Sequence, residues 1–375
     1  MAGIYIHIPF CKRKCHYCNF FSVASERLRS GFMEALKAEA VAQKGYLEKE
    51  TIRTVYIGGG TPSLLKANEL EGILSVIFSQ YPVDPEAEIT VEMNPDDASR
   101  QLLREYRHLP LNRISLGVQS FNDNDLKTLD RLHDGRKAKD ALENILGSGY
   151  KNVSIDLIYG IPGSSVHSWA KNLETFMDYR LPHLSAYALT VEENTAMRWL
   201  IRKGRMPLPD EERMADQYSV LAETMEQHGY VHYEISNYAK KGWYSKHNSL
   251  YWLGGHYLGL GPSAHSYNGH SRQWNPCSIH QYRQVADYRE MAREKEVLSE
   301  EEKFNEYVMT SLRTAWGCDT GHIRNVFGDA FVKHFTNRVG KYLSQGLVVS
   351  KESNYYLTGR GKLLADGIIS DIFLG

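Results

Sequence analysis

The sequence lacks the features that point to a membrane, to secretion or to nucleic acid. No apolar run approaches the roughly 20 residues that a bilayer-spanning helix needs. The first residues, MAGIYIHIPFC, contain no basic leader followed by an apolar stretch. Lysine and arginine number 44 against 45 aspartate and glutamate, so no basic excess favours nucleic acid. We therefore expect a cytoplasmic protein with no nucleic-acid partner.

Cysteine is scarce, with five residues in a chain of 375, yet three of the five lie close together. Cys11, Cys15 and Cys18 all belong to the stretch CKRKCHYCNF, whereas Cys277 and Cys318 stand alone. In a reducing compartment, an odd and clustered set of thiols favours metal binding or catalysis over a disulfide framework. We expect Cys277 and Cys318 to be small, buried apolar residues.

The first half of the chain alternates short β-branched or aromatic runs with longer amphipathic stretches. The pattern predicts strands over 3–9, 54–60, 88–94, 113–120, 152–160 and 183–190. It predicts helices over 25–46, 67–80, 98–108, 122–129, 136–148 and 166–178. Six β–α units imply parallel strands with helical crossovers, as in an α/β barrel or a doubly wound sheet.

The positions of the polar residues favour the barrel. Five of the six predicted strands end in glycine, acidic, amide or hydroxyl residues, and the first leads directly into the cysteine loop. Barrels carry their chemistry at the carboxyl ends of parallel strands. The strand-end residues are Gly58 to Thr61, Glu92 with Asn94, Gln119, Asp156 and Thr190. We therefore predict a partial (β/α)6 barrel over residues 1–202.

The pattern changes after KGRMPLPDEE at 203–212, which has two prolines and predicts a linker. Beyond it we expect a helix over 211–228, a glycine-rich loop over 254–262, and helices over 278–294 and 300–314. The end of the chain is typical of a hairpin followed by a helix. We predict a second segment over 203–295 and a mainly helical, winged-helix-like domain over 296–375.

Two metal sites are compatible with the C-x3-C-x2-C spacing of Cys11, Cys15 and Cys18. Structural zinc takes four ligands, usually in two pairs, and here there is one triplet and no second pair. His16 would be a fourth ligand only with an awkward local backbone. A [4Fe–4S] cluster held by three thiolates leaves one iron open to a small molecule, which suits the triplet better.

The motifs together resemble a known superfamily. The stretches YIHIPFC, GGGTP, VEMNPD, LGVQSFN, IDLIYGIPG and YALTVEENT are similar to those of radical S-adenosylmethionine (SAM) proteins. The branch that they resemble contains oxygen-independent coproporphyrinogen III oxidase and haem chaperones, and the likeness covers nearly the whole chain. It implies a partial radical SAM barrel in which the open iron of the cluster binds SAM.

The resemblance also implies which residues form the site. Cys11, Cys15 and Cys18 match the cluster ligands, and Tyr17 matches the aromatic residue beside them. The positions matching those around SAM are Tyr5, Gly59, Gly60, Thr61, Glu92, Gln119, Arg131 and Asp156. Bare glycine backbone suits the methionyl ammonium, the two acidic residues suit ribose hydroxyls, and arginine suits a carboxylate.

Two local features favour the haem chaperones over the oxidase. Phe20 stands where the oxidase has a further cysteine, and the oxidase's N-terminal extension has no counterpart before Tyr5. The stretch HNSLYW at 247–252 resembles the HNxxYW signature of HemW-type chaperones. It makes His247 the first candidate haem ligand and His265 the second, with the alternative that HNSLYW is a packed turn.

The expected function is therefore binding of haem and its transfer to an acceptor protein, for instance one of a respiratory chain. The expected cofactors are a [4Fe–4S] cluster, SAM and haem, and a homodimer is compatible with the sequence. The alternative is a radical SAM enzyme that removes carbon dioxide from the propionates of coproporphyrinogen III. A zinc-stabilised barrel with an unrelated small substrate is a third hypothesis.

Overall fold

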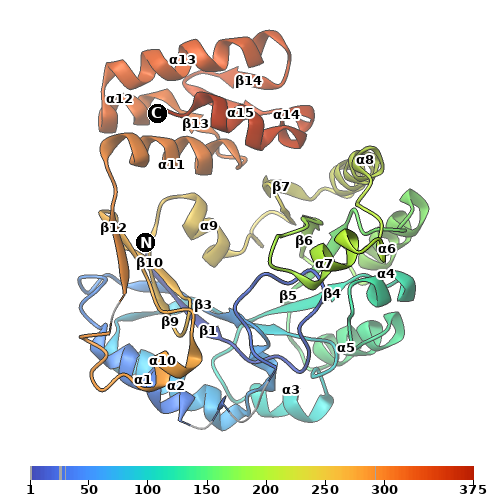
Figure 1. Ribbon diagram of the computed structural model, residues 1–375, viewed down its shortest axis with the longest axis vertical. Coiled ribbons are helices and arrows are strands. Elements are labelled where there is room, and N and C mark those ends of the chain that lie inside the picture. The colour runs from blue at the N-terminus through green and yellow to red at the C-terminus, as the bar shows by residue number, and fades with distance from the viewer. Residues whose placement is uncertain (1, 25–27, 30, 292) are drawn as a thin grey trace.

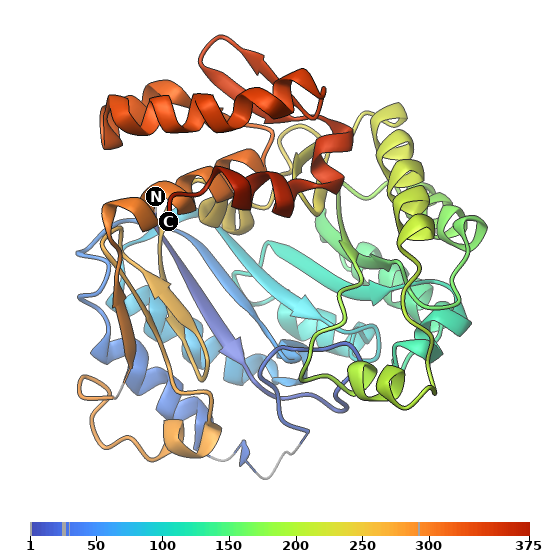
Figure 2. The same ribbon diagram turned by 45° about the horizontal axis from the view of Figure 1, so that its top comes forward.

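The computed structural model of this protein describes residues 2–24, 28–29, 31–291 and 293–375. Its main element is a 12-stranded sheet with strand order β12-β11-β10-β9-β1-β2-β3-β4-β5-β6-β8-β7, covered by helices as Figure 1 shows. A mainly helical domain at the carboxyl end of the chain lies above this sheet in both Figure 1 and Figure 2. None of the helices in the described residues combines the length and apolar character needed to cross a bilayer.

The six predicted strands are confirmed and pair in parallel in sequence order. Nearly every position of the fourth and fifth strands is buried, as expected for parallel strands covered on both faces. The strands are β1 (Ala2–Ile8), β2 (Ile52–Gly59), β3 (Val83–Met93), β4 (Arg113–Gln119), β5 (Asn152–Tyr159) and β6 (His183–Ala188).

The helices between these strands also follow the prediction, with one clear shortening. The helix expected over 25–46 is found as α1 (Phe32–Ala42), while positions 25–27 and 30 lie outside the described residues. The others are α2 (Ala67–Gln80), α3 (Arg100–Tyr106), α4 (Asp123–Thr128), α5 (Gly135–Gly147) and α6 (Val166–Asp178), with a 3-10 turn, η2 (Pro62–Leu64), after β2.

The barrel does not close, because β1 and β6 each pair with another strand on their outer edges. Strand β9 (His256–Leu260) runs parallel to β1, and β8 (Asn237–Ala239) runs antiparallel to β6. The sheet is therefore the predicted partial barrel, extended at both ends. The second extension contains β7 (Val231–Glu234), reached through α7 (Ala196–Arg202) and α8 (Glu211–Gln227).

Two predictions for residues 254–294 were wrong. The glycine-rich loop contains strand β9, where a Cβ on Gly259 would lie 2.1 Å from the carbonyl oxygen of His265. Glycine is needed there because two backbones approach closely. A glycine-rich composition on its own is typical of a loop, so the strand was not predicted. The helix expected over 278–294 is only α10 (Ile279–Arg283). Strands β10 (His265–Tyr267), β11 (Ser271–Trp274) and β12 (Glu294–Val297) complete this extension.

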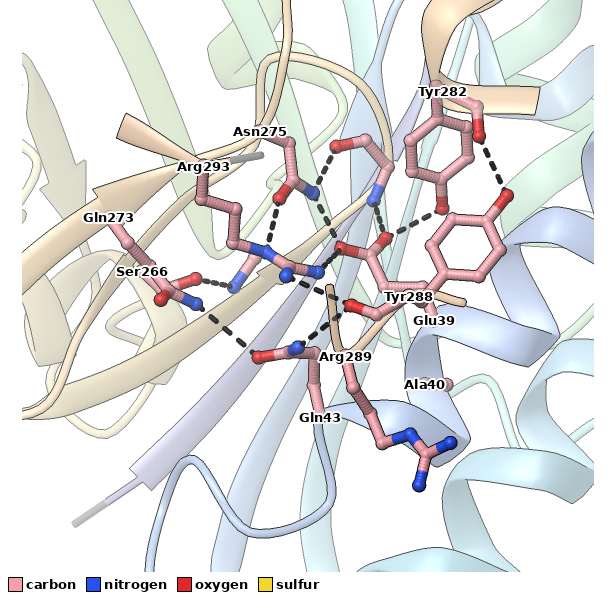
Figure 3. A network of polar contacts seen from close by, with 12 residues as sticks. Glu39, Ala40, Gln43, Ser266, Gln273, Asn275, Tyr282, Tyr288, Arg289 and Arg293 are labelled. Carbon is pink, nitrogen blue, oxygen red and sulfur yellow. Dashed lines mark hydrogen bonds and ion pairs between the residues drawn. The ribbon is translucent and has the colours of Figure 1, made fainter. Parts of the chain in front are cut away.

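A buried carboxylate attaches the extension to α1 (Figure 3). Glu39 is fully buried and accepts hydrogen bonds from the Tyr282 hydroxyl at 2.6 Å, the Asn275 amide at 2.7 Å and the Gly261 backbone at 2.8 Å. Arg293 lies 3.1 Å from the same carboxylate. These bonds and the ion pair compensate for the cost of burying the charge.

The carboxyl-terminal domain has its own apolar core, built around residues from Phe304 to Ile372. It ends in the predicted hairpin and helix. Cys318 is buried, as predicted. The prediction that Cys277 is buried was wrong, because that residue is exposed. The elements are α11 (Glu300–Leu312), β13 (Cys318–Asp319), α12 (Thr320–Phe327), α13 (Asp329–Ser344), β14 (Val348–Lys351), β15 (Asn354–Leu357), α14 (Gly359–Leu363) and α15 (Ala365–Ile372). The domain boundaries at 202 and 295 stay predictions.

Candidate functional site: a cysteine-lined cavity at the strand ends

A cavity of about 370 Å³ opens at the carboxyl ends of the parallel strands. It is bounded by the loop that follows β1 and by residues at the ends of β2 to β6, which is where a barrel concentrates its chemistry. Most of the predicted site residues line it, namely Cys11, Cys15, Tyr17, Cys18, Gly59, Gly60, Thr61, Glu92, Gln119, Arg131 and Asp156. Tyr5 and His247 do not.

The cysteine loop presents three half-buried thiols to this cavity. Thr61 donates a hydrogen bond to Cys11 Sγ at 3.5 Å, and Arg131 Nη1 donates one to Cys15 Sγ at the same distance. Burial raises the pKa of the Cys11 and Cys18 thiols. In the described part of the chain, no three His, Cys, Asp or Glu side chains are grouped so as to hold a single metal ion.

Gly60 is needed for the close contact between the cysteine loop and the GGGTP turn. A Cβ at this position would lie 2.7 Å from the Phe10 carbonyl oxygen and 3.0 Å from Cys11 Sγ. The loop is further held by a backbone bond of 3.1 Å from Cys11 to Val23 and one of 3.2 Å from His16 to Leu129. The backbone thus carries the thiols toward the turn without a side chain between them.

Two carboxyl groups lie at the floor of the cavity. Glu92 accepts hydrogen bonds from the Tyr56 hydroxyl at 2.7 Å and the Gly59 backbone at 3.1 Å. Burial, with a smaller contribution from the charge of Asp156, raises the pKa of Glu92 to about 7. Burial likewise raises the pKa of Asp156 to about 6, against the hydrogen bond that Ser115 donates to it. Hydrogen bonds donated by ligand hydroxyls would offset the free-energy cost of burying both carboxylates.

Arg131 supplies positive charge on the other side of the cavity. Its Nη2 donates to Asn94 Oδ1 and to the Gly117 carbonyl oxygen, both at 2.8 Å. Its hydrogen-bond acceptors in the described residues are therefore neutral groups and the Cys15 thiol, with no carboxylate among them. An arginine held in this way can take a carboxylate of a bound ligand.

The backbone of Gln119 is unusual where β4 ends. Its φ is 67°, which a non-glycine residue rarely adopts. The Gln119 side chain approaches Gly117, where a Cβ would lie 2.9 Å from Nε2. The strain at this position fixes an amide group in the cavity wall, and strain of this kind is concentrated at functional sites.

Some lining residues were not predicted as site residues. Asn94 was noted only as a strand-end residue, although it links Arg131 to the Thr61 hydroxyl, to which it donates at 3.0 Å. Ser115 and Tyr187 also line the cavity. Ser115 lies in β4 and Tyr187 in β6. Because side chains alternate between the two faces of a strand, the sequence could have identified which positions face the cavity. Asp96 and Asp97 follow β3 and were hidden in the stretch NPDD, which is typical of a turn.

Tyr5 and His247 form a separate aromatic cluster. Tyr5 donates to or accepts from His7 Nδ1 at 3.0 Å, and its ring packs on Tyr56 with 6.2 Å between centroids. His247, in α9 (Lys246–Trp252), stacks on Tyr56 at 4.9 Å. Neither residue lines the cavity, but Tyr56, on which both rings stack, donates to Glu92 in the cavity wall. The other candidate ligand, His265, is exposed and stacks on Trp274 at 5.5 Å.

Comparisons with known proteins show the family of this chain. The Radical SAM superfamily model matches residues 5–176, and the HemN C-terminal domain model matches residues 298–364. Heme chaperone HemW of Lactococcus lactis subsp. lactis (strain IL1403) is 34% identical over 371 residues, which cover 99% of this chain and 97% of the relative. The chain belongs to the HemW family. The HemW of Bacillus subtilis (strain 168) is 33% identical over 379 residues and the full length of both chains.

The fold of this HemW family member is similar to that of a solved structure. Coproporphyrinogen III oxidase (HemN) from Escherichia coli, described as a radical SAM enzyme, superposes with a TM-score of 0.85. The superposition covers 99% of this chain and 90% of the oxidase at 23% sequence identity. At this identity the likeness supports the partial radical SAM barrel and its helical C-terminal domain.

Membership of the radical SAM superfamily implies a [4Fe–4S] cluster and SAM. The residues fit both groups. Cys11, Cys15 and Cys18 offer three thiols to one cavity, and Gly60 leaves room beside Cys11 that a Cβ would fill. Three thiolate ligands leave one iron of a four-iron cluster without a protein ligand.

Proposed function

We propose that this protein binds haem and transfers it to an acceptor protein, and that it holds a [4Fe–4S] cluster and SAM in the cysteine-lined cavity. The observation that carries the proposal is full-length similarity to proteins named heme chaperone HemW at 33–34% identity. The HNSLYW stretch supports it, because Tyr251 and Trp252 line a second cavity beside the first.

In the first cavity, the chain's own groups match the parts of SAM. Arg131 binds the carboxylate, and the bare backbone of Gly59 and Gly60 approaches the ammonium. Glu92 and Asp156 accept from ribose hydroxyls, which relieves the cost of their burial. Cys11, Cys15 and Cys18 would hold the cluster, which would supply electron-transfer chemistry next to SAM.

Haem binding is assigned to the HNSLYW stretch and its surroundings. His247 remains our predicted ligand of the haem iron, and Tyr251 and Trp252 present aromatic faces to the macrocycle. In the structure described here, both nitrogens of His247 are hydrogen-bonded, to Thr54 Oγ1 and to the Tyr251 hydroxyl, each at 2.8 Å. Ligation by His247 therefore requires one of these two bonds to open.

The proposal includes a protein that receives the haem, such as a component of a respiratory chain, and a homodimer. An acceptor is required because haem is largely apolar and is poorly soluble in water. Two adjacent exposed apolar residues of the C-terminal domain, Leu363 and Leu364, offer contact area for either partner.

One experiment separates the candidate functions. The full-length chain is purified anaerobically, reconstituted with iron and sulfide, and its absorbance recorded with and without haem. A cluster spectrum together with a Soret band, and loss of that band when a haem-free acceptor is added, supports the chaperone. Formation of deoxyadenosine with loss of carbon dioxide from coproporphyrinogen III supports the oxidase alternative. Bound zinc with neither signal contradicts both.

A further inference from the structure

A row of hydrogen bonds connects two thiols of the cysteine loop through three residues from other parts of the fold. Thr61 Oγ1 donates to Cys11 Sγ at 3.5 Å, and Asn94 Nδ2 donates to Thr61 Oγ1 at 3.0 Å. Arg131 Nη2 donates to Asn94 Oδ1 at 2.8 Å, and Arg131 Nη1 donates to Cys15 Sγ at 3.5 Å. Asn94 therefore lies in the middle of the row, between the donors to the two sulfurs.

The chemistry of its neighbours fixes the orientation of the Asn94 amide. Arginine has donors and no acceptor, so the Asn94 oxygen faces Arg131 and the amide nitrogen faces Thr61. Because the Thr61 hydroxyl oxygen already accepts from Asn94, its single hydrogen is free to point at Cys11. The Asn94 amide thus makes Thr61 a donor to sulfur.

The position of Asn94 is itself fixed, directly after β3. Its backbone N–H donates to Ser63 Oγ at 3.2 Å, and its carbonyl oxygen accepts from the Asp97 backbone at 3.0 Å. Ser63, in the 3-10 turn η2, in turn donates to the Asp97 carboxylate at 2.9 Å. The NPDD turn and η2 therefore hold the amide in place independently of the cysteine loop.

Arg131 keeps donors for a ligand while it contacts sulfur. A guanidinium has five N–H groups. Three of them are used by Asn94, by the Gly117 carbonyl oxygen at 2.8 Å and by Cys15. The two that remain can bind the ligand carboxylate assigned to Arg131 above. The bonds to Asn94 and Gly117 fix the guanidinium plane, so that one side chain serves both the sulfur and the ligand.

We propose that Asn94 is a positioning residue that raises the reduction potential of the iron–sulfur cluster by directing Thr61 and Arg131 at the sulfurs of Cys11 and Cys15. This inference rests on the cluster in the function proposed above and adds a residue predicted only as a strand end. Reduction adds negative charge to the cluster and its thiolates. Hydrogen bonds donated to sulfur stabilise that charge and so make reduction easier.

The test is a redox titration of the full-length protein after anaerobic reconstitution with iron and sulfide, without SAM. Electron paramagnetic resonance of the reduced cluster gives the midpoint potential. Asn94→Ala removes the acceptor of Arg131 and the donor to Thr61 together. At a fixed solution potential, we expect the ratio of reduced to oxidised cluster to fall about tenfold, which is about 59 mV for one electron.

Two further variants separate positioning from a general loss of structure. Thr61→Val removes the donor to Cys11 alone, whereas Thr61→Ser keeps the hydroxyl. We expect Thr61→Val to lower the midpoint potential by less than Asn94→Ala does, and Thr61→Ser to keep the potential close to that of the parent protein. In the double variant, Thr61→Val should add little to Asn94→Ala, because both changes remove the same bond to sulfur.

Asn112→Ala is the matched control. Asn112 also holds β3, through the Ala87 carbonyl oxygen at 2.7 Å and the Ile89 backbone N–H at 2.8 Å, and it does not line the cysteine-lined cavity. Its replacement should leave the midpoint potential unchanged.

Each contrary outcome bears on a different proposal. Equal potentials in Asn94→Ala and the parent protein, with the cluster present in both, would overturn the role of Asn94 and leave the cluster standing. An equal fall in Asn94→Ala and Asn112→Ala would also overturn it, since any disturbance of β3 would then explain the shift. Absence of a cluster signal in the parent protein would overturn the cluster and this inference together.

Discussion

Glu92 and Asp156 are acidic side chains that the fold buries before any ligand arrives. Their hydrogen-bond partners satisfy part of each carboxylate, yet burial still raises the pKa of Glu92 to about 7. The folded chain therefore binds a proton at Glu92 over a pH range in which the unfolded chain, with a pKa near 4.5, does not. Residues selected for stability alone would be apolar here, which supports a ligand-binding role for this pair.

Replacement of Glu92 by glutamine tests this interpretation. Because the folded-state pKa is raised, the stability of the parent protein falls as pH rises from about 4.5 to 7. The cluster-free Glu92→Gln variant lacks this loss, so at pH 8 it should exceed the parent's free energy of unfolding by about 1–3 kcal/mol. Urea unfolding at pH 5 and pH 8 measures the difference, which should be smaller at pH 5. A variant less stable than the parent at pH 8 would contradict the prediction.

The thiols of the cysteine loop give a second prediction for single residues. Cys15→Ala should lower bound iron from about four atoms per chain and remove the cluster absorbance, since two thiolates do not hold the cube. Cys277→Ala is the matched control, because Cys277 is exposed and lies outside the cavity. Iron analysis and absorbance after anaerobic reconstitution measure both variants. Equal iron in the two variants would rule out Cys15 as a ligand.

Among the elements, α1 joins the parallel strands to the extension β9 to β12 through the carboxylate of Glu39. Removing this group leaves Arg293 buried, with 8% of its side chain exposed, and without its ion-pair partner. Tyr282 loses its acceptor at the same time. The extension therefore depends on one acidic residue that no local sequence pattern identifies.

Glu39→Ala should lower the free energy of unfolding by about 3–5 kcal/mol, the usual cost of breaking a buried ion pair. Glu290→Ala, an exposed change close to the same extension, should alter it by less than about 0.5 kcal/mol. Urea unfolding gives both values, and hydrogen exchange should show faster exchange over 256–297 in Glu39→Ala. Equal stability of the two variants would show that the network contributes little.

The elements also show what the sequence could predict. The six parallel strands were predicted within a few residues because each contains a short run rich in β-branched or aromatic residues that ends in polar residues. The site residues at those ends follow from the position of chemistry in barrels. Strand β9 was missed because Gly259 is required by the backbone of His265 in the neighbouring strand β10, and the glycine-rich composition is typical of a loop. The sequence left open whether HNSLYW is a packed turn, because the burial of His247 depends on Thr54 and Tyr56, which come from a distant strand.

For the whole molecule, the important relation is that the two cavities share a wall. Tyr187, at the end of β6, lines both the cysteine-lined cavity and the second cavity, and the residue is 41% exposed. A ligand on either side of this ring can alter its position. If SAM binds in the first cavity and haem in the second, as proposed, this shared ring would give a physical route by which one ligand changes the binding of the other.

This route predicts a measurable coupling. SAM should change the haem dissociation constant of the reconstituted protein by about fivefold or more, and haem should change SAM affinity by the same factor, because coupling free energy is reciprocal. Tyr187→Ala removes the shared ring and should reduce both factors toward one, whereas Tyr187→Phe should retain most of the effect. Absorbance titration of haem with and without SAM, and calorimetric titration of SAM with and without haem, measure the two sides. Coupling of equal size in Tyr187→Ala and the parent protein would show that it does not pass through this residue.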